Sequence, residues 1–145
     1  MSTTPHFEEI SEGTELPELT KKIRPVDMMM YGAATWDFMR VHYDADHARE
    51  RGFEGPILDG QMEGAFLAQL VVDWVGDPGS LRRLGIRYRN FTYPGDTVVC
   101  KGKVQKKFIE DSDALVECEL VVENMTRDEV AALGTAVVAL PRRQA

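Results

Sequence analysis

The sequence has no apolar run long enough to cross a membrane. A spanning helix needs roughly 18 or more mostly apolar residues, and charged residues interrupt every apolar stretch of this chain before that length. The N-terminus also lacks a basic stretch followed by an apolar segment, the pattern of a secretion signal. We therefore expect a cytoplasmic protein with no membrane contact.

Positive charge is also in short supply. The chain has 17 basic and 24 acidic residues, which gives a net charge of −7. Proteins that bind nucleic acid rely on cationic surfaces, so we expect no nucleic-acid partner. The one dense group of cations comprises Arg82, Arg83, Arg87 and Arg89. Such a group suits a small polyanionic ligand, and a solvated strand face explains it equally well.

Several familiar chemical motifs are absent. The chain contains no GxSxG elbow, phosphate loop, dinucleotide fingerprint or CxxC pair, which argues against the chemistries that use them. Its two cysteines, Cys100 and Cys118, lie in alternating apolar segments and are expected to be small buried hydrophobes. Asp44, Asp46 and His47 are crowded in sequence, but helix capping explains Asp44 better than metal binding does. We predict no metal site.

The length and composition fit one ordinary globular domain. A chain of 145 residues with 43% hydrophobic and 28% charged residues lies within the usual range for a single core. No repeat, linker or low-complexity segment divides it. We expect residues 1–145 to form one domain, in which residues 1–18 are an extended N-terminal arm leading to a short strand at 19–23.

The first half of the chain carries helical signals. Pro25 suits a first helical turn and Gly32 suits the end of that helix. Asp44 can cap a second short helix that stops near Gly52. The segment 61–75 is apolar on nearly every side of a helix, which predicts a buried helix wrapped by the rest of the domain.

The second half changes to a period of two, which is typical of strands. Alternating segments lie at 84–88, 98–104, 114–122 and 130–140, and Pro94-Gly95-Asp96 predicts a turn between the first two. The order of elements predicts an α+β fold, in which one curved antiparallel sheet encloses a single long helix.

One carboxylate and one imidazole stand out as candidates for chemistry. His6 lies in the arm and His47 on the expected outer face of a helix, whereas His42 follows Asp37 by five residues just before the apolar helix. Functional side chains are frequent on such connections. Asp37 and His42 could hold a water molecule and exchange protons with it near neutral pH. The alternative is an Asp–His hydrogen bond that only stiffens the loop.

Gly60 is the third candidate, because it stands where the apolar helix begins. Unpaired backbone N–H groups and the positive end of the helix favour negative charge there, and a residue without a Cβ lets a ligand approach closely. A carbonyl oxygen that gains charge during a reaction could be stabilised at this point. The alternative is that Gly60 only permits the turn after Pro56.

Three segments resemble a known family: FEEISEGTELPELT from Phe7 to Thr20, YGAATWDFMRVHYD, and GFEGPILDG. They are similar to the MaoC-like dehydratases, which share the hot-dog fold with (R)-specific enoyl-CoA hydratases. The family pattern Asp-x-Asn-Pro-x-His corresponds to Asp37 through His42, and Gly-Phe-x-x-Pro-Ile-Leu-His-Gly corresponds to Gly52 through Gly60. Met39, Arg40 and Asp59 depart from these patterns.

The resemblance implies a function and a set of roles. Asp37 and His42 would activate water, and the Gly60 amide would bind the thioester oxygen of a trans-2-enoyl-CoA. The expected activity is that of a hydro-lyase, an enoyl-CoA hydratase or 3-hydroxyacyl-thioester dehydratase, with no cofactor because coenzyme A is part of the substrate. Arg87 or Arg89 could meet the CoA phosphates, since arginine suits bidentate phosphate contacts.

The resemblance also implies an assembly. Hot-dog chains normally work as homodimers or higher oligomers, and the Asp-Phe-x-x-Val-His form resembles small subunits that act on steroid-type acyl-CoA and pair with a second MaoC-like chain. Two rival functions remain at this point. One is hydrolysis of an acyl-CoA thioester on the same fold, and the other is a partner-dependent, catalytically silent subunit that binds acyl-CoA.

Overall fold

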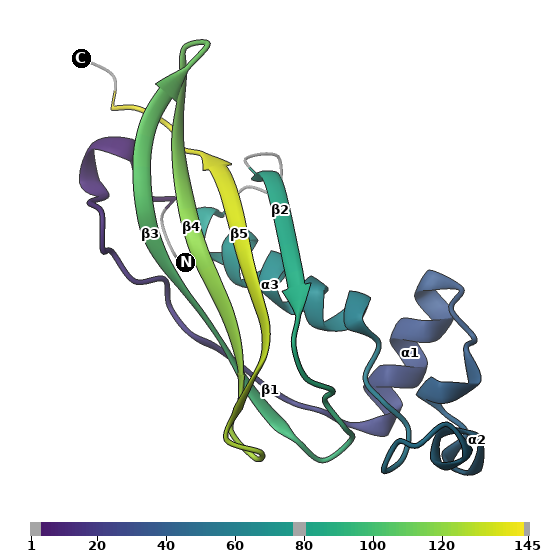
Figure 1. The fold of residues 1–145 in the computed structure, drawn as a ribbon. Coiled ribbons are helices and arrows are strands. Elements are labelled where there is room, and N and C mark those ends of the chain that lie inside the picture. The colour runs from purple at the N-terminus through teal and green to yellow at the C-terminus, as the bar shows by residue number, and fades with distance from the viewer. Residues whose placement is uncertain (1–3, 77–80, 144–145) are drawn as a thin grey trace.

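The computed structural model describes residues 4–76 and 81–143. An antiparallel sheet of five strands curves along one side of a long helix, α3, while two shorter helices lie beyond one end of the sheet (Figure 1). No helix in these ranges combines the length and the apolar character that crossing a membrane would need. In chain order the elements are η1 (Phe7–Glu9), β1 (Leu19–Lys22), α1 (Pro25–Thr35), η2 (Arg40–His42), α2 (Ala45–Glu50), α3 (Gly60–Val75), β2 (Leu81–Tyr88), β3 (Thr97–Glu110), β4 (Asp113–Asn124) and β5 (Glu129–Ala139).

The sheet order is β1-β3-β4-β5-β2, and every pairing is antiparallel. Strands β3, β4 and β5 pair in chain order, but the predicted turn at Pro94-Gly95-Asp96 does not join two paired strands, because β2 does not lie beside β3. β2 pairs with β5, with Leu84 opposite Ala136, and so forms the edge opposite β1. The connection at residues 89–96 is longer than a usual hairpin loop of 2–5 residues, so the turn at Pro94 and Gly95 lets the chain cross to the far side of the sheet.

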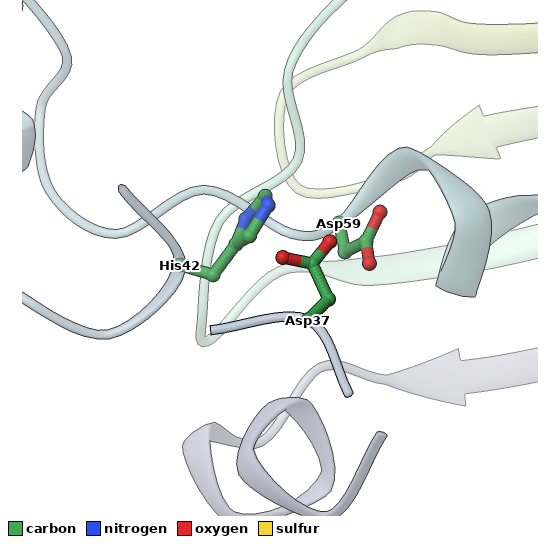
Figure 2. A group of neighbouring side chains, drawn as sticks. All are labelled: Asp37, His42 and Asp59. Atoms are coloured by element: carbon green, nitrogen blue, oxygen red, sulfur yellow. The ribbon is translucent and has the colours of Figure 1, made fainter. Parts of the chain in front are cut away.

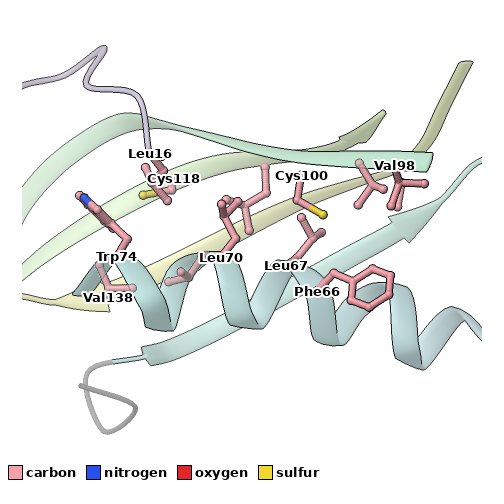
Figure 3. Close-up of a cluster of buried hydrophobic side chains, with 14 of the residues drawn as sticks. Leu16, Phe66, Leu67, Leu70, Trp74, Val98, Cys100, Cys118 and Val138 are labelled. Atoms are coloured by element: carbon pink, nitrogen blue, oxygen red, sulfur yellow. The ribbon is translucent and has the colours of Figure 1, made fainter. Parts of the chain in front are cut away.

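Helix α3 packs one face against the sheet. Leu67, Val71 and Val75 are fully buried, and the labelled side chains in Figure 3 show this face of the helix against strands of the sheet. The expectation that the helix is buried all round is wrong. Positions four apart share one helix face, and on α3 one such face carries small or polar side chains that stay in solvent. The exposed residues are Gln61, Ala65, Gln69 and Asp73.

Both cysteines are free and buried in this core. Desolvation raises the pKa of the Cys100 thiol to about 12 and that of the Cys118 thiol to about 12 as well. The thiolate is the reactive form of cysteine, so both residues act as small hydrophobes, as the sequence predicted.

Helix α1 is longer than predicted and ends at Thr35 instead of Gly32. Trp36 caps it in the left-handed conformation, with φ at 59°, and Asp37 donates its N–H to the Gly32 carbonyl at 2.9 Å. A Cβ on Gly32 would lie 2.9 Å from the Asp37 carbonyl oxygen. Gly32 therefore permits the chain to turn back against the last helical turn and does not end the helix itself.

A buried polar network ties the loop before α3 to the sheet. Asp96 is 3% exposed and accepts hydrogen bonds from Asn124 at 2.8 Å and from Arg127 Nε at 2.7 Å. The Arg127 guanidinium also pairs with Glu54 at 3.0 Å. Burial raises the pKa of Asp96, but the hydrogen bonds from Asn124 and Arg127 outweigh it and hold the pKa below the ordinary value.

Arg127→Ala is expected to lower the free energy of unfolding by about 2–3 kcal/mol, because it leaves the buried Asp96 carboxylate without its cation. The difference from the wild type should be largest at neutral pH. A depressed pKa contributes stability only above the ordinary pKa of the carboxyl, and that contribution is lost as the pH falls through the folded-state pKa.

Urea unfolding followed by circular dichroism measures this effect. Arg49→Ala is the control, since the ion pair between Arg49 and Asp46 is exposed and spans 3.5 Å, and such pairs contribute little. Equal losses in the two variants, or a pH-independent loss for Arg127→Ala, would contradict the role given to Asp96.

Candidate active site

Three side chains from two loops meet beside the N-terminus of α3. Asp37 follows the C-cap of α1, His42 lies in η2, and Asp59 is the N-cap of α3. One potential ligand atom from each lies within 4.8 Å of the others, and Figure 2 shows the three side chains converging. The structure thus brings together the two predicted catalytic residues and adds Asp59 to them.

The His42 ring is held by the backbone and not by Asp37. Its Nδ1 lies 2.8 Å from the Ile57 carbonyl oxygen, and Ile57 in turn donates its N–H to Val41 at 3.0 Å. Because a carbonyl oxygen only accepts, Nδ1 carries the proton in the neutral ring and Nε2 is left as the acceptor. The alternative of an Asp37–His42 hydrogen bond that stiffens the loop has no support among the described residues.

The Asp37 carboxylate is half-buried and lightly held. Its Oδ1 accepts the N–H of Met39 at 3.1 Å, which is an Asx-type turn that fixes the direction of the side chain. A water molecule hydrogen-bonded to two partners at about 2.8 Å separates them by about 4.5 Å. One potential ligand atom of Asp37 and one of His42 lie within 4.8 Å of each other, so the two groups are close enough for one water molecule to contact both.

The start of α3 offers a free backbone donor. Gly60 is the first helical residue, so its N–H has no acceptor within the helix, and no described residue accepts it from outside. The carbonyl of Gly60 accepts the Tyr88 hydroxyl at 2.6 Å. A Cβ on Gly60 would lie 3.2 Å from the Tyr88 ring, so glycine is needed there for close packing. Its φ lies outside the left-handed region, so the turn itself does not require glycine.

Asp59 caps the same helix with one oxygen and leaves the other unused. Its Oδ1 accepts the N–H of Gln61 at 2.8 Å, whereas Oδ2 is buried and is the one such side-chain atom in the described ranges without a hydrogen-bond partner. With Asp37 and His42 it forms a group whose potential ligand atoms are close enough together to hold a metal ion. The prediction that this protein has no metal site stays a prediction.

His42 lines two cavities. The first, of about 310 Å³, has mostly apolar walls lined by Met28, Met29, Gly32, Ala33, Asp37, Phe38, His42, Tyr43, Asp59 and Met62. The second has a volume of about 330 Å³ and lies at the end of the edge strand β2. It is lined by His42, Ile57, Leu58, Gly60, Glu63, Tyr88, Arg89, Asn90, Phe91 and Thr92. A ligand with two arms could place one arm in each cavity and its reacting centre beside His42.

The two arginines proposed for CoA phosphates have different surroundings. Arg89 lines the second cavity together with His42. Arg87 lies in a hollow formed with Glu119 and Thr135 and lines neither cavity at His42. Strand β2 ends at Tyr88, so the chain leaves the regular alternation of the strand before Arg89.

The residues predicted to have no catalytic or metal-binding role lie away from the site. His6 precedes η1 and His47 lies in the first turn of α2, and neither lines the two cavities. Asp44 caps α2 by accepting the N–H of His47 at 3.0 Å. This confirms capping as the role of Asp44.

Sequence reasoning missed a buried acid in the second cavity. Glu63 is 4% exposed, and the Thr92 hydroxyl donates to its Oε1 at 2.8 Å. Burial raises the pKa of Glu63, although the hydrogen bond from Thr92 opposes this shift. The available signal was an acidic residue within the most apolar segment of the chain, one turn after Gly60.

A family model described as a MaoC like domain matches residues 7–126. This chain belongs to that family. This chain is similar to the 3-oxo-4,17-pregnadiene-20-carboxyl-CoA hydratase beta subunit of Mycobacterium tuberculosis. The two are 29% identical over 120 residues, which are 83% of this chain and 90% of the relative.

Solved structures share the fold of this chain. One match is a chain of the ChsH1–ChsH2 complex from Mycobacterium tuberculosis, with a TM-score of 0.78 and 25% identity. The match covers 90% of this chain and 98% of that one. The unliganded R-hydratase PhaJ1 from Pseudomonas aeruginosa has a TM-score of 0.83 and 22% identity, over 95% of this chain and 86% of its own. The predicted α+β hot-dog fold is confirmed.

Proposed function

We propose that this MaoC-like chain catalyses the reversible hydration of a trans-2-enoyl-CoA to an (R)-3-hydroxyacyl-CoA. The observation that carries the proposal is the convergence of Asp37 and His42, within the 4.8 Å cluster, beside the free amide of Gly60. Family membership supports the reaction type. Coenzyme A enters as part of the substrate, and the proposal includes no other cofactor.

The geometry supports the following steps. The thioester oxygen accepts the Gly60 N–H, while a water molecule lies between the Asp37 carboxylate and His42 Nε2. The water oxygen bonds to Cβ, the electron pair of the double bond moves toward the thioester oxygen, and one proton of the water passes to the Asp37–His42 pair. The enolate charge develops against the Gly60 amide and the positive end of α3. A proton from the pair then reaches Cα.

The first cavity supports a bulky apolar acyl group. Its walls are mostly apolar, and Met29 and Phe38, which line it, are 66% and 53% exposed, so a group larger than its volume of about 310 Å³ can extend out of it. The relative named for a pregnadiene carboxyl-CoA supports an alicyclic, steroid-type acyl group. In this arrangement Arg89, at the second cavity, is the arginine placed to meet the CoA phosphates.

Ala33→Leu is expected to lower kcat/KM for a bulky alicyclic enoyl-CoA by about tenfold or more, because Ala33 lines the first cavity and the added carbons occupy acyl space. Turnover of crotonyl-CoA should change less. Ala34→Leu, on the same helix but outside the lining, is the matched control. A fall of the same size for both substrates would contradict the assignment of the acyl arm.

A second candidate function has its own support. Trp36, the chain neighbour of Asp37, is 82% exposed and Met30 on α1 is 66% exposed. Apolar surface of this kind is often covered in an assembly. The beta-subunit name and the ChsH1–ChsH2 complex are those of multi-chain relatives. The chain would then be an acyl-CoA-binding subunit that works with a second MaoC-like chain. The first proposal, in contrast, expects a homodimer or a higher oligomer of this chain.

The test of the proposed function is hydration of an enoyl-CoA by the purified chain. Loss of the conjugated thioester absorbance without release of free thiol supports hydration, whereas release of thiol indicates hydrolysis of the thioester.

A further inference from the structure

The second cavity contains a buried carboxyl group that the proposed steps do not use. Glu63 lies on α3 one turn after Gly60, and both residues line this cavity with His42. The Glu63 side chain is buried, and no arginine, lysine or histidine of the described ranges forms an ion pair with it. A buried acid without a counter-ion is unfavourable for folding, and such groups are frequent where a ligand binds.

The two oxygens of Glu63 have different surroundings. Oε1 accepts the Thr92 hydroxyl at 2.8 Å. Oε2 has no donor in the described part of the chain, yet it is not among the fully buried atoms that lack a partner. Oε2 therefore keeps access to the cavity. Ile57, Leu58 and Phe91 line that cavity with apolar atoms, so Oε2 is an unused acceptor in an otherwise poor environment for it.

The spacing along α3 matches the chemistry of a CoA thioester. Residues three apart on a helix are neighbours, with Cβ atoms about 5–6 Å from each other. In the pantetheine arm, a sulfur and two methylene groups separate the thioester carbonyl from the nearest amide N–H. If the thioester carbonyl binds the Gly60 amide, the first amide N–H of the pantetheine arm would therefore lie about one helical turn further along α3, next to Glu63.

We propose that Glu63 Oε2 accepts a hydrogen bond from the first pantetheine amide N–H of the bound thioester. This inference rests on the proposed function, since it takes the thioester oxygen to lie at Gly60. It assigns the pantetheine arm to the second cavity, on the same side as Arg89, and leaves the first cavity for the acyl group. Glu63 is then a specificity-determining residue that distinguishes pantetheine thioesters from simple alkyl thioesters.

The experiment compares the binding of two matched probes by calorimetry. One is butanoyl-pantetheine, which is saturated and cannot be hydrated, and the other is its analogue with a methylene in place of the first amide nitrogen. Wild-type protein should bind the amide probe about tenfold more tightly, because one buried hydrogen bond is at stake. Glu63→Leu should remove this preference, whereas Glu63→Gln should keep much of it because its amide oxygen still accepts.

Thr92→Val is the control for a purely structural role. It removes the partner of Oε1 but leaves the Glu63 carboxyl in place, so the preference for the amide probe should persist. The proposal is overturned if wild-type protein shows no preference, or if folded Glu63→Leu retains it. This experiment measures binding and not turnover. If the wild-type protein fails to hydrate enoyl-CoA, that failure counts against the proposed function, but not against the hydrogen bond between Glu63 and the pantetheine amide.

Discussion

Asp37→Asn is expected to lower kcat for enoyl-thioester hydration by about 10²–10⁴-fold, the usual range for losing a group that transfers a proton. Asparagine keeps the shape of the side chain and its oxygen can still accept the Met39 N–H, but it cannot take a proton from water. His42→Ala should have an effect of similar size. Since both groups act on one water molecule, the double variant should be about as slow as the slower single variant.

The chain offers matched controls for both substitutions. Asp46 is exposed on α2, and His47 lies outside both cavities, so Asp46→Asn and His47→Ala should leave kcat unchanged. Circular dichroism and urea unfolding show whether each variant is folded. Full activity of folded Asp37→Asn or His42→Ala would remove that residue from the mechanism, and additive losses in the double variant would show that the two residues act on different steps.

The second large effect is expected for Gly60→Ala, with kcat/KM lowered by about 10²–10³-fold, the size found for losing one oxyanion donor. The new methyl would lie 3.2 Å from the Tyr88 ring. That ring cannot move away freely, because its hydroxyl donates to the Gly60 carbonyl at 2.6 Å. The methyl would therefore displace the start of α3, and with it the Gly60 N–H that is proposed to bind the thioester oxygen.

Gly55→Ala is the matched control for Gly60→Ala. Gly55 is on the same loop, but a Cβ there would meet no atom within 4 Å, so its activity should equal that of the wild type. Initial rates over a range of enoyl-CoA concentrations give kcat/KM for both. Unchanged kcat/KM in Gly60→Ala would show that the thioester oxygen binds elsewhere.

Local pattern was enough to predict most elements of the fold. Alternation located β3, β4 and β5, and the short side chain of Asp44 located the start of α2. Strand pairing is not local, so the position of β2 at the far edge beside β5 could not be read from its own residues. The exposed face of α3 was missed although Gln61, Gln69 and Asp73 are polar, because their spacing by multiples of four, and not the apolar composition of the segment, places them on one face with Ala65.

The site was predicted in part. The spacing of Asp37 and His42, together with the family resemblance, located two members of the cluster, and the structure places them together. Asp59 and Glu63 were missed because their roles depend on what tertiary folding brings near them. The hydrogen bond between His42 and the Ile57 carbonyl joins two loops, and no sequence pattern predicts it. Arg87 and Arg89 look equivalent until the end of β2 at Tyr88 is known.

The measurement that tests the central claim most directly is hydration of a panel of trans-2-enoyl-CoA thioesters, from crotonyl-CoA to a steroid-side-chain analogue, with chiral analysis of the product. Wild-type protein is expected to give (R)-3-hydroxyacyl-CoA, with the highest kcat/KM for a bulky acyl group, and neither Asp37→Asn nor His42→Ala should show comparable turnover. Failure of well-folded protein to hydrate any thioester of the panel would contradict the account and favour the partner-dependent binding subunit.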